Sequence, residues 1–198
     1  MQVKEFLFED LRNMNFDKTK ISIDSLKLSK DIDNKQSNYY CYKDLDNINN
    51  EFTNIYLLDI PHSLDDINKI LKLKPKKIYL VCNEKQIMSD VYKIDKSRLV
   101  KLFNIILNAP NKQVNITQKL DYLLSSLMTD INSLKIMIQI FQELNLVKVE
   151  NNIIILNPNY ETVNLRKSTM YVKMENIFEV ERLLLKDSII NINKKFEK

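Results

Sequence analysis

Residues 55–81 read IYLLDIPHSLDDINKILKLKPKKIYLV, and this stretch decides the fold of the first half of the chain. Short apolar runs at 55–58 and 78–81 enclose a segment in which apolar residues recur at helical spacing. Ser63 is a favourable N-cap for that helix, and Pro75 marks its end. A strand, a helix and a strand within about thirty residues form a βαβ unit, so we expect parallel strands joined by a right-handed crossover.

Two further apolar runs, at 6–8 and 39–42, precede this unit. Continuous runs of this kind are typical of strands that are buried on both faces. Residues 21–23 alternate like another strand, whereas residues 31–37 have the composition of a loop. The first half is therefore expected to be α/β, with a Rossmann-like parallel sheet.

The second half of the chain changes to helical periodicity near residue 93. Its apolar pattern predicts one helix that ends before Pro110 and a second that Thr117 caps. A third helix follows, with Asp130 or Asn132 as its N-cap. Each of these helices has one apolar stripe, so we expect them to pack around a common core.

A β-hairpin follows the third helix, with strands expected at 147–149 and 153–156 around an Asn-rich turn. Three helices followed by a hairpin are the pattern of a winged helix. A last amphipathic helix is expected at about 171–186. The expected divisions are an α/β subdomain at 1–94, a winged-helix subdomain at 95–160, and a C-terminal helical segment at 161–198 that packs on the rest.

The chain contains no glycine, and this count excludes several kinds of site. A phosphate-binding Walker loop, a dinucleotide-binding fingerprint and a nucleophile elbow each need glycine for a tight turn or a close backbone approach. Left-handed positions must then be taken mainly by asparagine, as expected at Asn49-Asn50 and Asn151-Asn152.

The remaining composition favours a cytoplasmic protein without a membrane partner. The sequence lacks a long apolar run and the pattern of a signal peptide. Cys41 and Cys82 have neither metal-ligand nor disulfide-framework spacing, so they are interpreted as buried reduced thiols. The net charge of +4 is a mild bias toward anionic partners.

Several short motifs resemble, in order, the C-terminal domain of RecJ-type single-strand-specific DNA exonucleases. In the first half they are Asp10-Leu-Arg-Asn13, Leu58-Asp-Ile-Pro-His-Ser-Leu64 and Pro75-Lys-Lys-Ile-Tyr-Leu80. In the second half they are Ser97-Arg98, Phe141-Gln-Glu-Leu144, Leu165-x-x-Ser168-x-x-Tyr171 and Glu179-Val-Glu-Arg-Leu-Leu-Leu185. One departure is Asn145, where the family usually has glycine; asparagine is the next-best residue for a left-handed helix cap.

The resemblance implies a setting in DNA repair and recombination. RecJ proteins degrade single-stranded DNA from the 5′ end with Mn or Mg held by Asp and His residues of a separate catalytic core. The Asp-His-His triplet of that core is absent here, and His62 is the single histidine of the chain. We therefore expect an accessory domain without catalytic residues, metal or cofactor. Whether it is an excised domain or a free-standing relative stays open.

The expected partners are the RecJ catalytic core, single-stranded DNA, and the acidic tail of the single-strand-binding protein (SSB). Basic residues cluster around Pro75 and after the hairpin, and the third helix presents a mixed polar face. An apolar pocket with a basic rim would suit the SSB tail, because charge steers the encounter and an apolar anchor supplies affinity. The candidate partner- or DNA-binding residues are Lys74, Lys76, Lys77, Lys135, Gln139, Arg166 and Lys167.

Two other classes of function remain as alternatives. A free-standing winged-helix DNA-binding regulator would need a basic face on the third helix, which is not present. A small magnesium-dependent enzyme would use Asp10, Asp44 and Asp59, which follow predicted strands. We favour turn and helix caps for these aspartates and a polar loop contact for His62.

Overall fold

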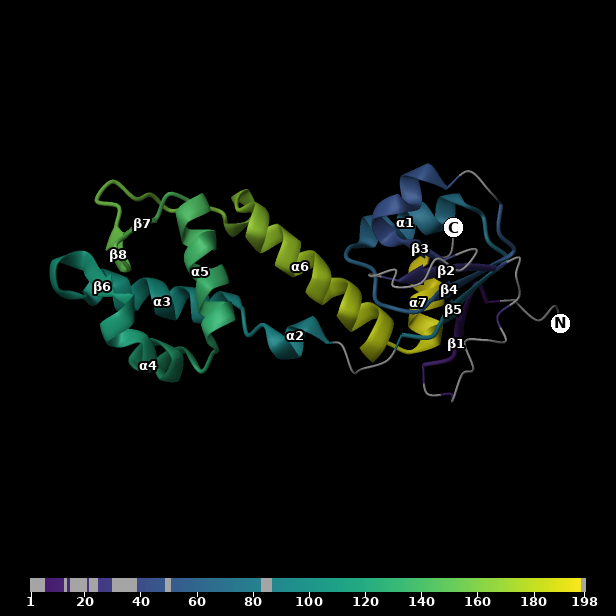
Figure 1. Ribbon diagram of the computed structural model, residues 1–198, viewed down its shortest axis with the longest axis horizontal. Helices are drawn as coiled ribbons and strands as arrows, with labels where there is room; N and C mark the ends of the chain where they lie inside the picture. The colour runs from purple at the N-terminus through teal and green to yellow at the C-terminus, as the bar shows by residue number, and fades with distance from the viewer. Residues whose placement is uncertain are drawn as a thin grey trace. The chain divides into compact units, whose positions relative to one another are not determined.

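The computed structural model divides the chain into two compact units (Figure 1). Unit 1 comprises Met1–Ile87 and Asn176–Lys198, and unit 2 comprises Met88–Glu175. The structure describes residues 6–12, 14, 21, 25–29, 39–48, 51–82 and 87–196. Within them, no helix has the length and apolarity needed to cross a bilayer.

Unit 1 is built on a five-stranded parallel sheet with the strand order β1-β5-β4-β2-β3. The strands are β1 (Phe8–Asp10), β2 (Ser25–Ser29), β3 (Tyr39–Cys41), β4 (Asn54–Leu57) and β5 (Lys77–Leu80). Helix α1 (Leu64–Lys72) connects the neighbouring strands β4 and β5, which confirms the expected βαβ unit.

The start of α1 follows directly from the sequence. The hydroxyl of Ser63 accepts from the backbone N–H of Asp66, and the carboxylate of Asp66 accepts in return from the backbone N–H of Ser63. This reciprocal capping box satisfies two amide groups that a helix start otherwise leaves without a partner. Pro75 lies just beyond the last helical residue, as expected.

The strands are less symmetrically buried than their apolar runs suggested. Ile55 and Leu57 are fully buried in the main core, whereas Tyr56 and its neighbour Tyr79 are half-buried on the opposite face, with their rings stacked at 4.5 Å between centroids. The prediction that the strands are buried on both faces is therefore wrong for the face that carries these tyrosines, which is only partly buried. A tyrosine ring is apolar enough to extend an apolar run in the sequence, yet its hydroxyl keeps it near solvent.

Strand β2 was not expected, although it lies between β4 and β3 inside the sheet. The strand expected at 21–23 falls mostly outside the described residues, as does the loop expected at 31–37; Ile21 itself is buried. Polar Ser25 and Lys27 alternate with fully buried leucines in β2, so the sequence shows no apolar run. The ammonium of Lys27 lies 4.6 Å from the ring centroid of Tyr39, and this cation–π contact offsets its burial.

The C-terminal part of the chain supplies the remaining core of unit 1. Helix α6 (Thr169–Glu181) continues into a π-helical turn at Arg182–Lys186, and α7 (Ile189–Phe196) follows. Leucines of the π-helical turn and Ile192 of α7 belong to the same buried cluster as the sheet. The helix expected at 171–186 is thus confirmed in outline, whereas α7 was not expected.

Unit 2 contains the three expected helices and the expected hairpin. Its helices are α2 (Met88–Val91), α3 (Lys96–Asn108), α4 (Ile116–Leu127) and α5 (Ile131–Glu143). Strands β6 (Gln113–Asn115), β7 (Val147–Glu150) and β8 (Ile153–Leu156) form an antiparallel sheet in the order β6-β8-β7. The cap of α4 is Asn115 and not Thr117, because β6 ends one residue before the helix begins.

Asparagine takes four of the seven left-handed positions among the described residues, namely Asn111, Asn145, Asn151 and Asn152. Asn145 ends α5 with φ 54°, as expected for an asparagine at a left-handed helix end. Lys74, Lys112 and Met128 hold the other three, so the expectation is only partly correct. Asn49-Asn50 lies outside the described residues.

Replacing Asp130 with Ala is expected to lower the free energy of unfolding by about 1–2 kcal/mol, because this residue caps α5. Its carboxylate accepts from the backbone N–H groups of Asn132 at 2.8 Å and Ser133 at 2.9 Å. Urea denaturation measures the change, with Asp121→Ala on the exposed side of α4 as the control. Equal stability of the two variants would contradict the role of the cap.

This contribution also depends on pH. Burial opposes ionisation, but hydrogen bonds from Ser133 and Asn132 outweigh it and hold the pKa of Asp130 below its usual value. The folded-state pKa is thus the depressed one. The stabilisation is present above the ordinary carboxyl pKa and is lost as pH falls through the folded value, where the two proteins should converge.

Candidate functional site

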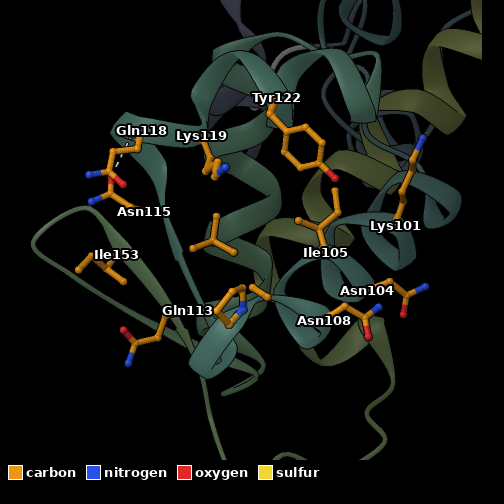
Figure 2. A pocket seen from close by; sticks show the side chains of 13 residues that line it. Lys101, Asn104, Ile105, Asn108, Gln113, Asn115, Gln118, Lys119, Tyr122 and Ile153 are labelled. Atoms are coloured by element: carbon orange, nitrogen blue, oxygen red, sulfur yellow. Dashed lines mark hydrogen bonds between the residues drawn. The ribbon is translucent and has the colours of Figure 1, made fainter.

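A polar pocket of about 650 Å³ lies in unit 2 at the surface that α3, β6 and α4 share (Figure 2). Most of its lining side chains are exposed, so the pocket is open to solvent. Its lining residues are Lys101, Asn104, Ile105, Asn108, Ala109, Pro110, Gln113, Val114, Asn115, Gln118, Lys119, Tyr122 and Ile153.

Helical spacing explains why these side chains gather. On α3, Lys101, Asn104 and Asn108 follow one another at intervals of three and four residues, which places them on one face. The opposite faces of both helices are buried in the core: Leu102 and Ile106 on α3, and Leu123 and Leu127 on α4. The apolar stripes fix how the helices are oriented, and the polar side chains are left to form the pocket.

The pocket is electrostatically one-sided. None of its lining residues is a carboxylate, and within the described part of the chain neither Lys101 nor Lys119 has an ion-pair partner. Residues 96–120 contain five basic residues and no Asp or Glu. This uninterrupted positive stretch is suited to an anionic ligand.

Tyr122 adds an aromatic surface to this positive pocket. Tyr122 is 56% exposed, more than Phe6 and Tyr160, the other exposed aromatic residues of the described part of the chain. In Figure 2 its ring lies between Lys119, which is also on α4, and Lys101 on α3. An aromatic face flanked by cationic groups can hold a planar group and the charges next to it.

Amide side chains and five apolar residues make up the rest of the lining. Asn115 is already used by the fold, because its side-chain oxygen accepts from the backbone N–H of Gln118 at 3.0 Å (Figure 2). Asn104, Asn108 and Gln113 are exposed. Each carries both a donor and an acceptor, so the pocket can pair with ligands of either hydrogen-bonding character.

The lysines around Pro75, expected as a docking surface, lie in unit 1. Lys74 and Lys76 are exposed. Lys77 is half-buried and pairs with Glu9 at 2.7 Å, and its ammonium also donates to the carbonyl of Phe6 at 2.9 Å. Lys77 therefore stabilises the edge of the sheet near β1, which leaves Lys74 and Lys76 as the exposed charges of this cluster.

The other four expected residues lie in unit 2. Lys135 and Lys167 are exposed, whereas the amide of Gln139 donates to Glu143 at 3.0 Å and Arg166 pairs with Glu175 at 3.0 Å. None of the seven expected residues lines the polar pocket. Their role in binding stays a prediction.

Sequence reasoning therefore missed Lys101, Lys119 and Tyr122. Each lies at an exposed position of an amphipathic helix, where the sequence pattern gives no reason to expect a binding site. The signal that could have found them is the absence of Asp and Glu over residues 96–120, because charges of both signs are interspersed along most of the chain.

The strand-end aspartate Asp10 has a structural partner. It forms an ion pair with Arg12 and accepts from the backbone N–H of Arg12 at 3.0 Å, as the turn-cap interpretation expects. The side-chain hydrogen bond from Arg12 holds the pKa of Asp10 below its usual value. Among the described residues, no group of three or more His, Cys, Asp or Glu side chains could hold a metal ion.

The remaining titratable candidates lie in structural settings. The carbonyl of Asp59 accepts a hydrogen bond from the hydroxyl of buried Tyr42. His62 is an exposed loop residue whose ring contacts that of Tyr42 edge-on, with 6.2 Å between centroids. Cys41 and Cys82 are buried free thiols, as expected, and burial raises the pKa of Cys82 to about 12.

A second pocket of unit 2, of about 300 Å³, has a different character. Its lining is mostly apolar, and Lys96 and Glu161 are its charged residues. Tyr160 packs against Phe103 there with 5.3 Å between ring centroids. The apolar lining residues are Leu99, Val100, Phe103, Phe141, Leu146, Tyr160, Val163 and Leu165.

The sequence matches a known protein family. A family model described as the C-terminal domain of single-strand DNA-specific exonucleases matches residues 7–196. No curated protein and no solved structure matches the chain.

Proposed function

The chain belongs to the family of C-terminal domains of single-strand DNA-specific exonucleases, and from this premise we propose that it is a non-catalytic accessory domain of a RecJ-like 5′–3′ exonuclease. Its setting would be DNA repair and recombination in the cytoplasm. The catalytic core, on the same polypeptide or on another, would supply the Mn or Mg chemistry. This domain would help to hold the single-stranded substrate or a protein partner.

Two observations support a role without catalysis. Arg12 forms an ion pair with the carboxylate of Asp10, so the aspartate at the end of β1 stabilises the fold. The single histidine, His62, lies in a loop against an aromatic ring. Hydrolysis of a phosphodiester by a RecJ-type centre needs several convergent Asp and His ligands.

The observation that carries the proposal of DNA docking is the positive, carboxylate-free pocket of unit 2. Phosphates are the dominant source of affinity in nucleic-acid binding, and lysines that lack ion-pair partners can contact them without first breaking another bond. We further propose that unit 2 is a winged helix, which its element order and its β6-β8-β7 sheet support.

The division at 1–94, 95–160 and 161–198 also remains a proposal. The alternative of a free-standing winged-helix regulator has weaker support. Helix α5, which would read DNA in that class, exposes one basic residue, Lys135, and one acidic residue, Glu143, and thus carries no net positive charge.

The test is a fluorescence-anisotropy titration of the chain against a labelled single-stranded oligonucleotide of about 20 nucleotides. We expect saturable binding in the range of about 10⁻⁶ to 10⁻⁴ M that weakens as salt is raised, and no degradation of the strand when Mn is added. Absence of binding at about 50 mM salt would contradict the docking of DNA. Degradation that survives repurification would contradict the non-catalytic role.

The apolar pocket favours a second candidate function, recruitment of the SSB acidic tail. An apolar anchor residue could fill that pocket while Lys96 at its margin meets a carboxylate. A labelled tail peptide should bind the chain, and Val100→Asp should abolish binding by placing a negative charge at the exposed edge of the pocket. Lys74→Ala/Lys76→Ala is the matched test of the lysines in unit 1. Undiminished binding by Val100→Asp would remove the apolar pocket from this proposal.

A further inference from the structure

We propose that the polar pocket binds single-stranded DNA by stacking a base on Tyr122 while Lys101 and Lys119 contact the phosphates on either side. This inference rests on the proposed function and deepens it, because it names the site, the ligand chemistry and the role of each side chain.

Tyr122 is the residue with the clearest reason to be a ligand contact. Burying an aromatic ring stabilises a fold, yet this ring stands 56% exposed at the surface of α4. The exposed Tyr160, by comparison, already packs on Phe103. Stacking a base on Tyr122 would cover its exposed face, and any base can do so because every base has a π-face.

Lys101 and Lys119 come from two helices and flank the ring in Figure 2. A strand that passes over Tyr122 carries a phosphate on each side of the stacked base, so cationic groups on both sides suit it. A lysine ammonium is a mobile point charge that can follow a flexible backbone, whereas a bidentate site would need arginine. No carboxylate lines the pocket to repel the phosphates.

The amide side chains favour a nucleic acid over an acidic peptide. A peptide that relies on lysines for steering still needs an apolar cleft to anchor a side chain. Ile105 lies next to the ring in Figure 2, and the rest of the lining offers Asn104, Asn108 and Gln118, which can donate to and accept from base edges. Because amides pair in both directions, the site should tolerate different base sequences.

Tyr122→Trp provides the most direct test, because the chain contains no tryptophan and the variant has a single indole reporter. We expect its emission to be quenched saturably by a single-stranded thymidine oligonucleotide, since stacking on a base quenches indole fluorescence. An abasic oligonucleotide of the same length and charge should bind more weakly and leave the emission nearly unchanged. Equal quenching by both would overturn the stacking role.

Anisotropy titrations of further variants distinguish the contribution of the Tyr122 ring to binding from that of the two lysines. Tyr122→Ala is expected to weaken binding about tenfold with an unchanged salt dependence, and Tyr122→Phe should restore wild-type affinity. Lys101→Ala/Lys119→Ala should reduce the slope of log K against log salt by about 1.4, because two phosphate contacts are lost. Lys173→Ala, which removes an exposed lysine on α6, is the matched control and should leave the slope unchanged.

The outcomes distinguish this inference from the proposed function. The wild-type chain could bind the oligonucleotide while Tyr122→Ala and Lys101→Ala/Lys119→Ala leave affinity and slope unchanged. The DNA would then bind elsewhere on the chain, so the inference would be wrong and the proposed docking of DNA would stand. If Lys135→Ala alone lowers the slope, the α5 face is the site and the inference is wrong. If the wild-type chain binds no single strand, both fail. An acidic peptide that displaces the oligonucleotide and quenches Tyr122→Trp equally would identify a protein-docking pocket and overturn the inference.

Discussion

Arg12→Ala is expected to lower the free energy of unfolding of the chain by about 2–4 kcal/mol, because it removes the buried partner of an ion pair. Only 11% of the Arg12 side chain is exposed. Its Nε donates to Asp10 Oδ1 at 2.8 Å, and its Nη2 donates to Asp10 Oδ2 at 2.5 Å. The substitution would leave the carboxylate without its bidentate partner.

The same guanidinium reaches the other end of the chain. Its Nη1 donates to the carbonyl of Leu184 at 2.5 Å, and both Nη groups approach the carbonyl of Asp187 at 3.3 and 3.4 Å. Leu184 lies within the π-helical turn and Asp187 just past its end, where backbone carbonyls attract positive charge. Arg12 therefore joins the end of β1 to the C-terminal part of unit 1.

Urea denaturation followed by circular dichroism measures the change, with Lys76→Ala on the exposed surface as control. Arg12→Lys keeps the charge but cannot reproduce the fork, so it should lie between wild type and Arg12→Ala. The double variant Asp10→Asn/Arg12→Ala should be less destabilised than the sum of its parts, because the two residues act as a pair. A loss below about 0.5 kcal/mol for Arg12→Ala would contradict the structural role.

This result also bears on function. The Asp-Leu-Arg motif is shared with the exonuclease family, and a catalytic interpretation of its aspartate predicts that Asp10→Asn abolishes an activity. The structural interpretation predicts instead that Arg12→Ala alters stability while the folded protein binds single-stranded DNA as the wild type does. Measuring oligonucleotide affinity at low temperature, where the variant is folded, distinguishes the two.

Asn193→Ala is expected to destabilise the chain by about 2–3 kcal/mol, because it leaves two buried backbone groups without hydrogen bonds. The side-chain oxygen of Asn193 accepts from the backbone N–H of Phe8 at 2.9 Å, and its amide donates to the carbonyl of Phe8 at 3.0 Å. Phe8 lies on β1, which is an edge strand of the sheet. The asparagine amide thus occupies the position that another strand would take.

The amide also donates to the carbonyl of Ile189 at 2.9 Å, so it is fixed to α7 as well as to β1. Asn193→Asp keeps the acceptor for the Phe8 N–H but places an anion against two carbonyls, and we expect it to be at least as destabilising as Asn193→Ala at neutral pH. Its stability should recover as pH falls and the carboxyl gains a proton that can donate.

Asn191→Ala and Asn191→Asp are matched controls, because Asn191 lies on the same helix with an exposed side chain. Thermal or urea unfolding should show little change in either. The uncovered edge of β1 should also raise the tendency of Asn193→Ala to aggregate, which light scattering detects. Equal stabilities of Asn193→Ala and Asn191→Ala would show that the contact with Phe8 contributes nothing.

The polar pocket shows why a site can escape sequence reasoning. Lys101 and Tyr122 are separated along the chain and belong to different helices, and each occupies an ordinary exposed position of an amphipathic pattern. Only the packing of α3 against α4 through their buried leucines and isoleucines brings them to one surface. Charge composition carried part of this information, because the absence of carboxylates over 96–120 is visible without a structure.

Features that depend on neighbouring residues could be predicted from the amino-acid sequence. The capping box of Ser63 and Asp66, the left-handed Asn145 and the strand–helix–strand order around α1 arise from interactions within a few residues, which the local pattern records. The family resemblance could likewise be read from short motifs in their order, and the match over 7–196 confirms it.

Features that join distant parts of the chain could not be predicted, because they form only when the chain folds. Strand β2 was hidden because its polar residues are buried by their neighbours, and a cation–π contact from Lys27 has no local signature. The bond between Phe8 and Asn193 spans 185 residues. Such contacts form because a sheet edge and a helix end present unpaired backbone groups that must be satisfied from elsewhere, and only the folded chain determines which side chain reaches them.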